Sequence, residues 1–143
     1  MALRYLTYFV VYSFLGWAID TAFRSAMVGQ YASGTLIPFF GIIYGCAALC
    51  ILVVGKQIHK RSLLLQALVY GSIATGVEYV GGNVGLALTG RMLWDYSVFP
   101  YDYNGFIALY ISLAWALISL LLVLVIHPRV QAHYNRFAMK SSA

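Results

Sequence analysis

The chain has very few charged residues, and this scarcity excludes an ordinary soluble domain. Charged residues make up 9% of the 143 positions, whereas about a quarter is typical of soluble domains. Apolar residues make up 62%. Water would solvate such a surface poorly, so the composition predicts one domain that lies in lipid.

Cysteines, metal-ligand patterns and catalytic motifs are also scarce. Cys46 and Cys50 share a face of an apolar run, which predicts buried thiols rather than a disulfide. The histidines His59, His127 and His133 lack the spacing of metal ligands. No nucleotide-binding or hydrolase motif is found. The sequence predicts neither metal nor cofactor, and it favours a protein that is not an enzyme without deciding the question.

Four apolar runs approach the roughly 20 residues that a helix needs to cross a bilayer. They cover about residues 5–23, 36–54, 62–88 and 104–126. The predicted fold class is all-α: a polytopic membrane protein whose four transmembrane helices form a bundle in a single domain, 1–143. Pro38 is expected in the first turn of the second helix. The third run is longer than a bilayer requires, and Gly81-Gly82-Asn83 offers a break in its helix.

The positive charges predict the orientation. Four spans place both termini on one side of the membrane, and most basic residues fall there: Arg4, Lys56, Lys60, Arg61, Arg129, Arg136 and Lys140. Arg24 and Arg91 fall on the other side. This bias predicts cytoplasmic termini in the plasma membrane, and it indicates lipid rather than nucleic acid as the partner. Residues 128–140 combine basic and apolar side chains at helical spacing, which predicts a short amphipathic helix on the inner surface.

The stretch "RMLWDYSVFPYDYNG", residues 91–105, gathers an arginine, two aspartates and five aromatic residues on the outer side. The aromatic residues suit the interface. Two further carboxylates, Asp20 and Glu78, fall at similar depth in the first and third runs. We predict one outward-facing polar network, with Trp94 and Tyr96 as its lid. The candidate site residues are Trp17, Asp20, Arg24, Glu78, Arg91, Trp94, Asp95, Tyr96 and Asn104. A purely structural role, in which Asp20 pairs with Arg24 and Glu78 with Arg91, is the alternative.

Several short motifs resemble a known family. "YSFLGWAID", "PFFGIIYG", "EYVGG" and "LWDYS" with its following proline and glycine are similar to the ABC-transporter type IV family, also called CmpB-like, of small bacterial integral membrane proteins. The resemblance covers roughly residues 12–115. Leu86 departs from it, because the family has a glutamate there. The resemblance implies that these residues carry the family signature: Tyr12, Ser13, Gly16, Trp17, Asp20, Tyr44, Gly45, Glu78, Trp94, Asp95, Tyr96 and Ser97.

Three functions remain open at this point. The first is a transport or permease-like component, which needs a second copy or a partner membrane subunit because four short spans enclose little space. The second is an accessory or assembly subunit without chemistry. The third, ranked last, is a membrane enzyme that acts on a lipid-linked substrate at the outer face.

Overall fold

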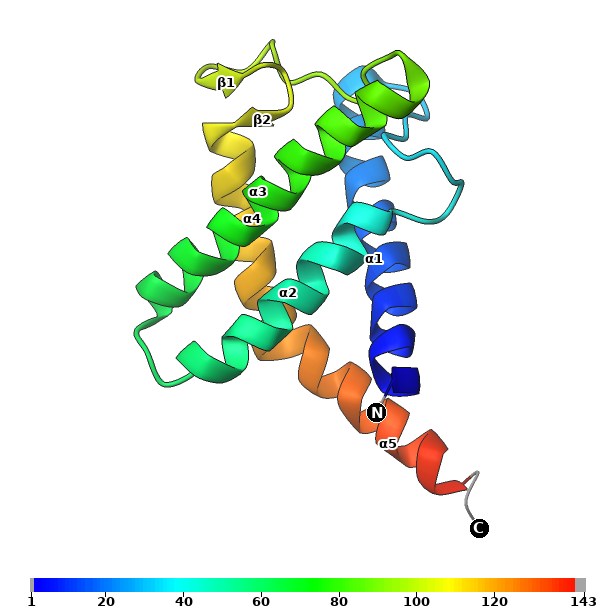
Figure 1. Cartoon of the computed structure of the whole chain (residues 1–143), viewed down its shortest axis with the longest axis vertical. Coiled ribbons are helices and arrows are strands. Elements are labelled where there is room, and N and C mark those ends of the chain that lie inside the picture. Colours follow the sequence, from blue (N-terminus) through cyan, green and yellow to red (C-terminus); the bar gives the residue numbers. More distant parts are fainter. Residues whose placement is uncertain (1, 141–143) are drawn as a thin grey trace.

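The computed structural model describes residues 2–140, and the ends of the predicted domain, Met1 and 141–143, lie outside the described residues. The described chain is almost entirely helical (Figure 1). Its elements are α1 (Ala2–Val28), α2 (Ile42–Ile58), α3 (Leu63–Thr89), β1 (Asp102–Tyr103), β2 (Ile107–Ala108), α4 (Leu109–Leu121), the π-helical η1 (Leu122–Ile126) and α5 (His127–Lys140). α1, α3 and the continuous helix Leu109–Met139 are long and apolar enough to cross a membrane, and α2 is a shorter apolar helix.

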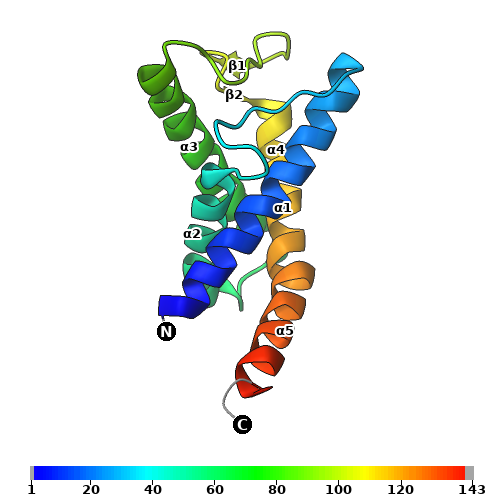
Figure 2. The same cartoon turned by 90° about the vertical axis from the view of Figure 1, so that its right-hand side faces the viewer.

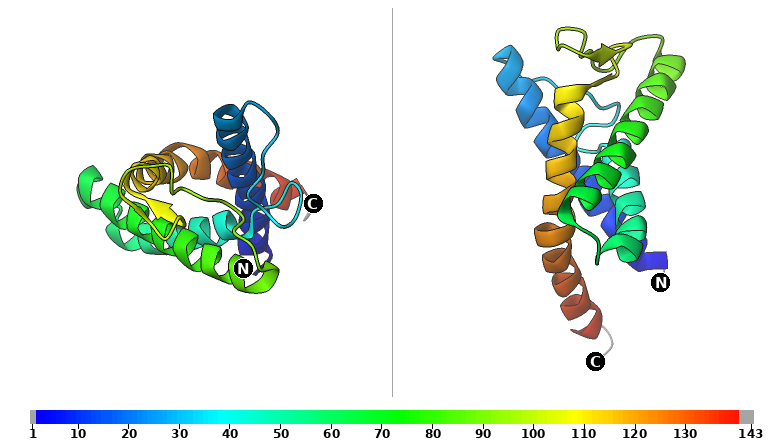
Figure 3. Two further views of the ribbon diagram at one scale, coloured as in Figure 1. Left: turned by 90° about the horizontal axis from the view of Figure 1, so that it is seen from above. Right: turned by 90° about the vertical axis from the view of Figure 1, so that its left-hand side faces the viewer.

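Both termini lie at one end of the molecule, which we call the termini end. The segments 29–41 and 91–108 lie at the opposite end, the loop end (Figures 1 and 2). α1 packs against α2, α2 against α3, and α3 against α4. α1 and α3 diverge toward the loop end with α4 between them (Figures 2 and 3). Segment 91–108 crosses the loop end from the end of α3 to the start of α4 (Figure 2).

α2 begins at Ile42, six residues after the predicted start at 36. Pro38 therefore lies in a turn ahead of the helix, where Phe40 N–H bonds to the carbonyl of Ile37 over 3.2 Å. The helix starts where Gly41 N–H donates to the carbonyl of Ser13 on α1 over 3.1 Å. A side chain on Gly41 would collide with the ring of Tyr44. Segment 29–41 consequently descends as non-helical chain toward the middle of the molecule.

α3 runs without interruption through Gly81, Gly82 and Asn83, so the predicted break is wrong. These glycines serve close packing instead. A Cβ on Gly82 would lie 2.5 Å from the Phe106 ring, and one on Gly81 would lie 2.5 Å from Ile43. Small residues of this kind let neighbouring segments approach closely within a membrane. The helix ends at Gly90, whose φ of 69° suits a glycine at a helix C-terminus.

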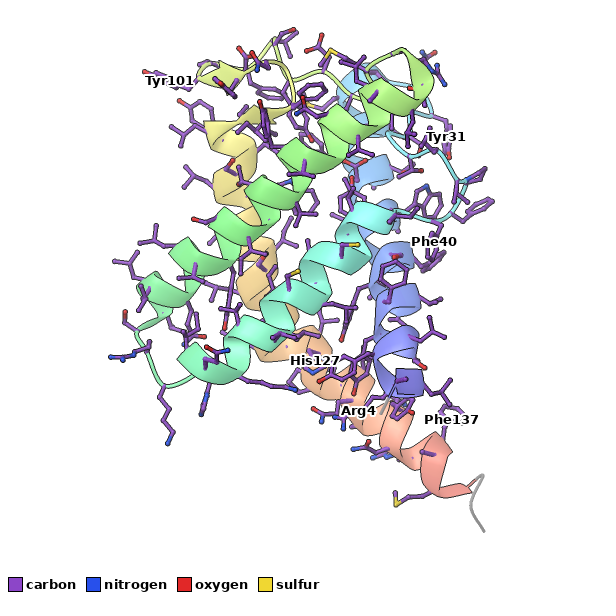
Figure 4. The ribbon with its side chains drawn as sticks, viewed as in Figure 1. Arg4, Tyr31, Phe40, Tyr101, His127 and Phe137 are labelled. Carbon is purple, nitrogen blue, oxygen red and sulfur yellow. The ribbon has the colours of Figure 1, made fainter. Side chains whose placement is uncertain are left out.

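The C-terminal segment is helical as predicted, but it continues α4 rather than forming a separate helix. Pro128 does not end the helix. It follows the π-helical turns of η1, where irregular hydrogen bonding accommodates a residue that has no backbone N–H. Phe137, near the end of α5, is 72% exposed (Figure 4). The prediction of buried thiols is also wrong, because Cys46 and Cys50 both lie on the exposed side of α2.

Candidate functional site

Two buried carboxylates, a partly buried arginine and a buried tyrosine form a hydrogen-bonded chain near the loop end. Arg24 Nε donates to Asp20 Oδ2 over 2.7 Å, one helical turn away on α1. Arg24 NH2 donates to the Tyr96 hydroxyl over 2.8 Å. That hydroxyl donates in turn to Glu78 Oε1 on α3, also over 2.8 Å. Tyr96 therefore connects α1 to α3.

The chain lies deep within the protein. The exposed fraction is 2% for Asp20, 4% for Glu78 and 2% for Tyr96. Burial raises the pKa of the Tyr96 phenol above its ordinary value, and the neighbouring Glu78 carboxylate raises this pKa further. The hydroxyl consequently keeps its proton, so it can accept from Arg24 and donate to Glu78 at the same time.

Two segments of the loop end cover the ion pair. The Arg24 guanidinium lies 5.7 Å from the ring centroid of Trp94 and 5.2 Å from that of Tyr96, within cation–π range. On another side, Gly34 approaches so closely that a Cβ there would lie 2.9 Å from Arg24 Nε. Gly34 and Gly41 are the buried residues of segment 29–41, and the rest of the segment is exposed or partly exposed.

Segment 91–108, which we call the cap, is an ordered structure that holds Tyr96 in place. β1 and β2 pair antiparallel, Asp102 opposite Ala108. Tyr96 N–H donates to the carbonyl of Gly105 over 2.8 Å. The indole of Trp94 donates to the carbonyl of Phe106 over 3.1 Å. These bonds join the start of the cap to its end, and they position the Tyr96 hydroxyl above Glu78.

Several predicted site residues lie outside this chain. Arg91 is exposed and belongs to no ion pair, since Asp20–Arg24 is the one ion pair within residues 2–140. Asp95 is exposed, and its carboxylate accepts the backbone N–H of Ser97 over 2.8 Å. Asn104 is an exposed turn residue with φ of 53°. Trp17 packs against Phe39, with ring centroids 4.8 Å apart.

A cavity of about 80 Å³ lies beside Glu78, and residues of α1, α2, α3, α4 and η1 line it. We call it the central cavity. Its lining includes Glu78 and the aromatic residues Tyr12, Tyr44 and Trp115. Glu78 Oε2 is buried and has no hydrogen-bond partner. The indole Nε1 of Trp115 is also buried and has no hydrogen-bond partner. No residue spacing in the sequence indicates this cavity, because its lining comes from four helices that are separate in the sequence.

A second polar cluster lies at the termini end (Figure 4). The Tyr12 hydroxyl and His127 Nδ1 are 2.7 Å apart, and Arg4 Nε donates to the Tyr8 hydroxyl over 2.9 Å. The Tyr8 and His127 rings also meet edge to face, with centroids 4.9 Å apart. In the described part of the chain no three His, Cys, Asp or Glu side chains gather as metal ligands would.

The long apolar helices and the buried polar chain between them define a multi-pass membrane protein. The chain belongs to the family described as "Putative ABC-transporter type IV", whose match covers residues 7–142. This confirms the resemblance noted in the sequence and extends it to nearly the whole chain. A comparison with curated proteins found no match, and a comparison with solved structures found none either.

Proposed function

We propose that this protein is a transport component of the plasma membrane, with Asp20, Arg24, Glu78 and Tyr96 as its outward-facing polar site. The observation that supports this proposal is the hydrogen-bonded chain that joins α1 to α3 through the cap. Buried charges are costly, and a functional role is the default expectation for ionisable groups inside a membrane. A purely structural pair would be complete with Asp20 and Arg24, whereas Glu78 adds a second carboxylate that this pair does not neutralise.

The same chain provides a mechanism for gating. Tyr96 is the one residue in it that belongs to the cap, and it holds the two helices through two hydrogen bonds. Displacing the cap breaks both bonds while leaving the Asp20–Arg24 pair intact within α1. The polar groups would then face the loop end. Opening therefore requires movement of one short segment rather than separation of the helices.

The proposal includes an orientation and a partner. Most basic residues outside the polar site belong to the termini end: Arg4, Lys56, Lys60, Arg61, Arg129 and Arg136. Positive residues favour the cytoplasmic side, so we place both termini inside and the cap outside. We also propose four spans arranged as a bundle, with α2 as the short one, and a second copy or a partner membrane subunit beside it. The exposed α2 face with Cys46 and Cys50 suits such a contact.

An electrical measurement on reconstituted protein tests transport. Proteoliposomes adsorbed to a solid-supported membrane receive concentration jumps of one solute at a time: sodium, potassium, ammonium, tetramethylammonium or phosphate. We expect a protein-dependent current for at least one solute, and loss of that current in Glu78→Gln. Asp95→Asn is the matched control, because this exposed carboxylate belongs to the cap but not to the buried chain. Absence of any current from folded protein contradicts transport and favours the accessory subunit.

A further inference from the structure

We propose that the central cavity binds a small alkylated ammonium ion against the Glu78 carboxylate, in competition with a proton. This inference rests on the proposed transport function and names the class of its substrate. It starts from the free oxygen of Glu78. Tyr96 occupies Oε1, whereas Oε2 is buried, has no hydrogen-bond partner and belongs to a residue that lines the cavity.

The charges around the site leave one negative charge without a partner. Asp20 and Arg24 form an ion pair over 2.7 Å and neutralise each other. Glu78 accepts the neutral hydroxyl of Tyr96 and lies near the neutral indole of Trp115, and the opposite charges of Asp20 and Arg24 act on it in opposite directions. An isolated ionised carboxylate is very costly in an apolar environment. Glu78 is therefore neutral in one of two ways: it carries a proton, or it pairs with a cation in the cavity.

The lining determines which cation suits the cavity. Most of the walls are aliphatic, with Leu15, Ile19, Val77 and Ile118 among them. Calcium requires six to eight oxygen ligands, and magnesium requires near-ideal octahedral coordination. Besides Glu78, the lining side chains that carry an oxygen are Tyr12, Tyr44 and Ser119, which together provide fewer side-chain oxygens than either ion requires. An alkylated ammonium requires none, because its methyl groups contact apolar walls while its charge faces the carboxylate.

Two aromatic rings strengthen this assignment. Tyr44 and Trp115 both line the cavity, and their ring centroids are 5.5 Å apart with an angle of 35° between the planes. The two rings pack against each other, so a cation in the cavity meets the free face or edge of a ring rather than the space between the two; aromatic rings hold quaternary ammonium groups through such cation–π attraction. The cavity volume of about 80 Å³ is several times the roughly 10–15 Å³ that one water molecule needs. A small ammonium ion fits this space, and a large lipophilic one does not.

An anion is the less suitable ligand for the same site. Arg24 is the nearest cation, and its guanidinium already donates to Asp20 and to Tyr96. Arg24 is also absent from the cavity lining, whereas Glu78 belongs to it. A negatively charged solute in the cavity would meet the carboxylate before any positive group.

Calorimetric titration of the purified full chain in detergent tests the assignment with tetramethylammonium as the probe. We expect saturable binding that sodium at equal ionic strength does not compete away, and no binding of the bulkier tetrapropylammonium. Titration in two buffers of different ionisation enthalpy should show up to one proton released per cation bound. That proton leaves Glu78 for the buffer as the ion pair forms. Asp95→Asn should bind as the unaltered chain does.

Two variants separate a lost site from a lost fold. Glu78→Gln should abolish both binding and proton release. Trp115→Leu keeps the carboxylate, and it should weaken binding by about two- to thirtyfold, the range expected for one cation–π contact. Absence of binding in the unaltered chain, equal competition by sodium, or unchanged binding in folded Glu78→Gln would each overturn the proposal. Tetramethylammonium binding without any transport current would contradict the transport function alone. A current for another solute, without tetramethylammonium binding, would contradict this inference alone.

Discussion

Replacing Tyr96 with phenylalanine isolates the hydroxyl that joins α1 to α3. The substitution keeps the ring, which packs against Phe99 with centroids 6.1 Å apart. It removes two hydrogen bonds of 2.8 Å, one from Arg24 and one to Glu78. The change therefore tests the connection between the helices without opening a cavity in the core.

The two losses differ in size. Hydrogen bonds to charged groups contribute about 1.5–3 kcal/mol each. The Arg24 side chain is 13% exposed and keeps its bond to Asp20, so part of its loss is recovered. Glu78 cannot replace its lost hydrogen bond in this way, because the residue is 4% exposed and its other oxygen has no partner. Hydrogen bonds between helices in membranes also average below those estimates. We expect the free energy of unfolding to fall by about 2–3 kcal/mol.

Thermal unfolding in detergent, followed by tryptophan fluorescence, measures this change. For a chain of this size, 2–3 kcal/mol corresponds to a decrease in Tm of roughly 4–12 °C. Tyr101→Phe is the matched control, since Tyr101 belongs to the same cap and is 75% exposed (Figure 4). The double variant Tyr96→Phe/Glu78→Gln should cost less than the sum of the single changes, because both remove the same bond. A Tm equal to that of the control, or strict additivity, would refute the connecting role of the hydroxyl.

Three further predictions concern packing, topology and the termini end. Gly82→Ala should lower the free energy of unfolding by about 1–3 kcal/mol, because the added Cβ would overlap the Phe106 ring. Gly76→Ala on the same helix is the control and should be neutral or slightly stabilising. Chemical denaturation measures both changes. In a background without the native cysteines, an impermeant thiol reagent applied to intact cells should label Ser97→Cys. It should label Ser62→Cys only after permeabilisation. The reverse pattern would show that the orientation is opposite to the one proposed. Tyr12→Phe should cost about 1–2 kcal/mol in thermal unfolding, since the histidine at the start of α5 then loses its partner, and an unchanged Tm would show that this bond is not formed.

The length and apolarity of the runs made most of the helices predictable. α1, α3 and the continuous helix Leu109–Met139 follow directly from stretches that are long enough to cross a bilayer. The start of α2 was not predictable from hydropathy, because it depends on a hydrogen bond between Gly41 and the backbone of Ser13 on another helix. The glycines of α3 were misjudged for a related reason. Their role is set by Phe106 and Ile43, which are remote in sequence.

The candidate site was likewise predictable in part. Asp20 and Arg24 are four residues apart, so their pairing could be predicted from helical spacing. The similar depth of Glu78 could be predicted from its position in the third run. The connection through Tyr96 could not, since it depends on the fold of the cap. Arg91 and Asp95 were included because they are charged and close in sequence, yet the cap turns both toward its exposed surface.

The sequence separations within the hydrogen-bonded chain also determine the order in which its contacts can form during synthesis. The Asp20–Arg24 pair lies within one helix, so α1 can enter the bilayer with its charges already compensated. Glu78 must wait for Tyr96, which is synthesised 18 residues later. The contact between Arg24 and Tyr96 spans 72 residues and becomes possible at the same point of synthesis. Until the cap emerges, α3 carries an uncompensated carboxylate that favours protonation or delayed insertion. A chain truncated before residue 96 is therefore the form most exposed to membrane quality control, whereas loss of the C-terminal helix would leave this step intact.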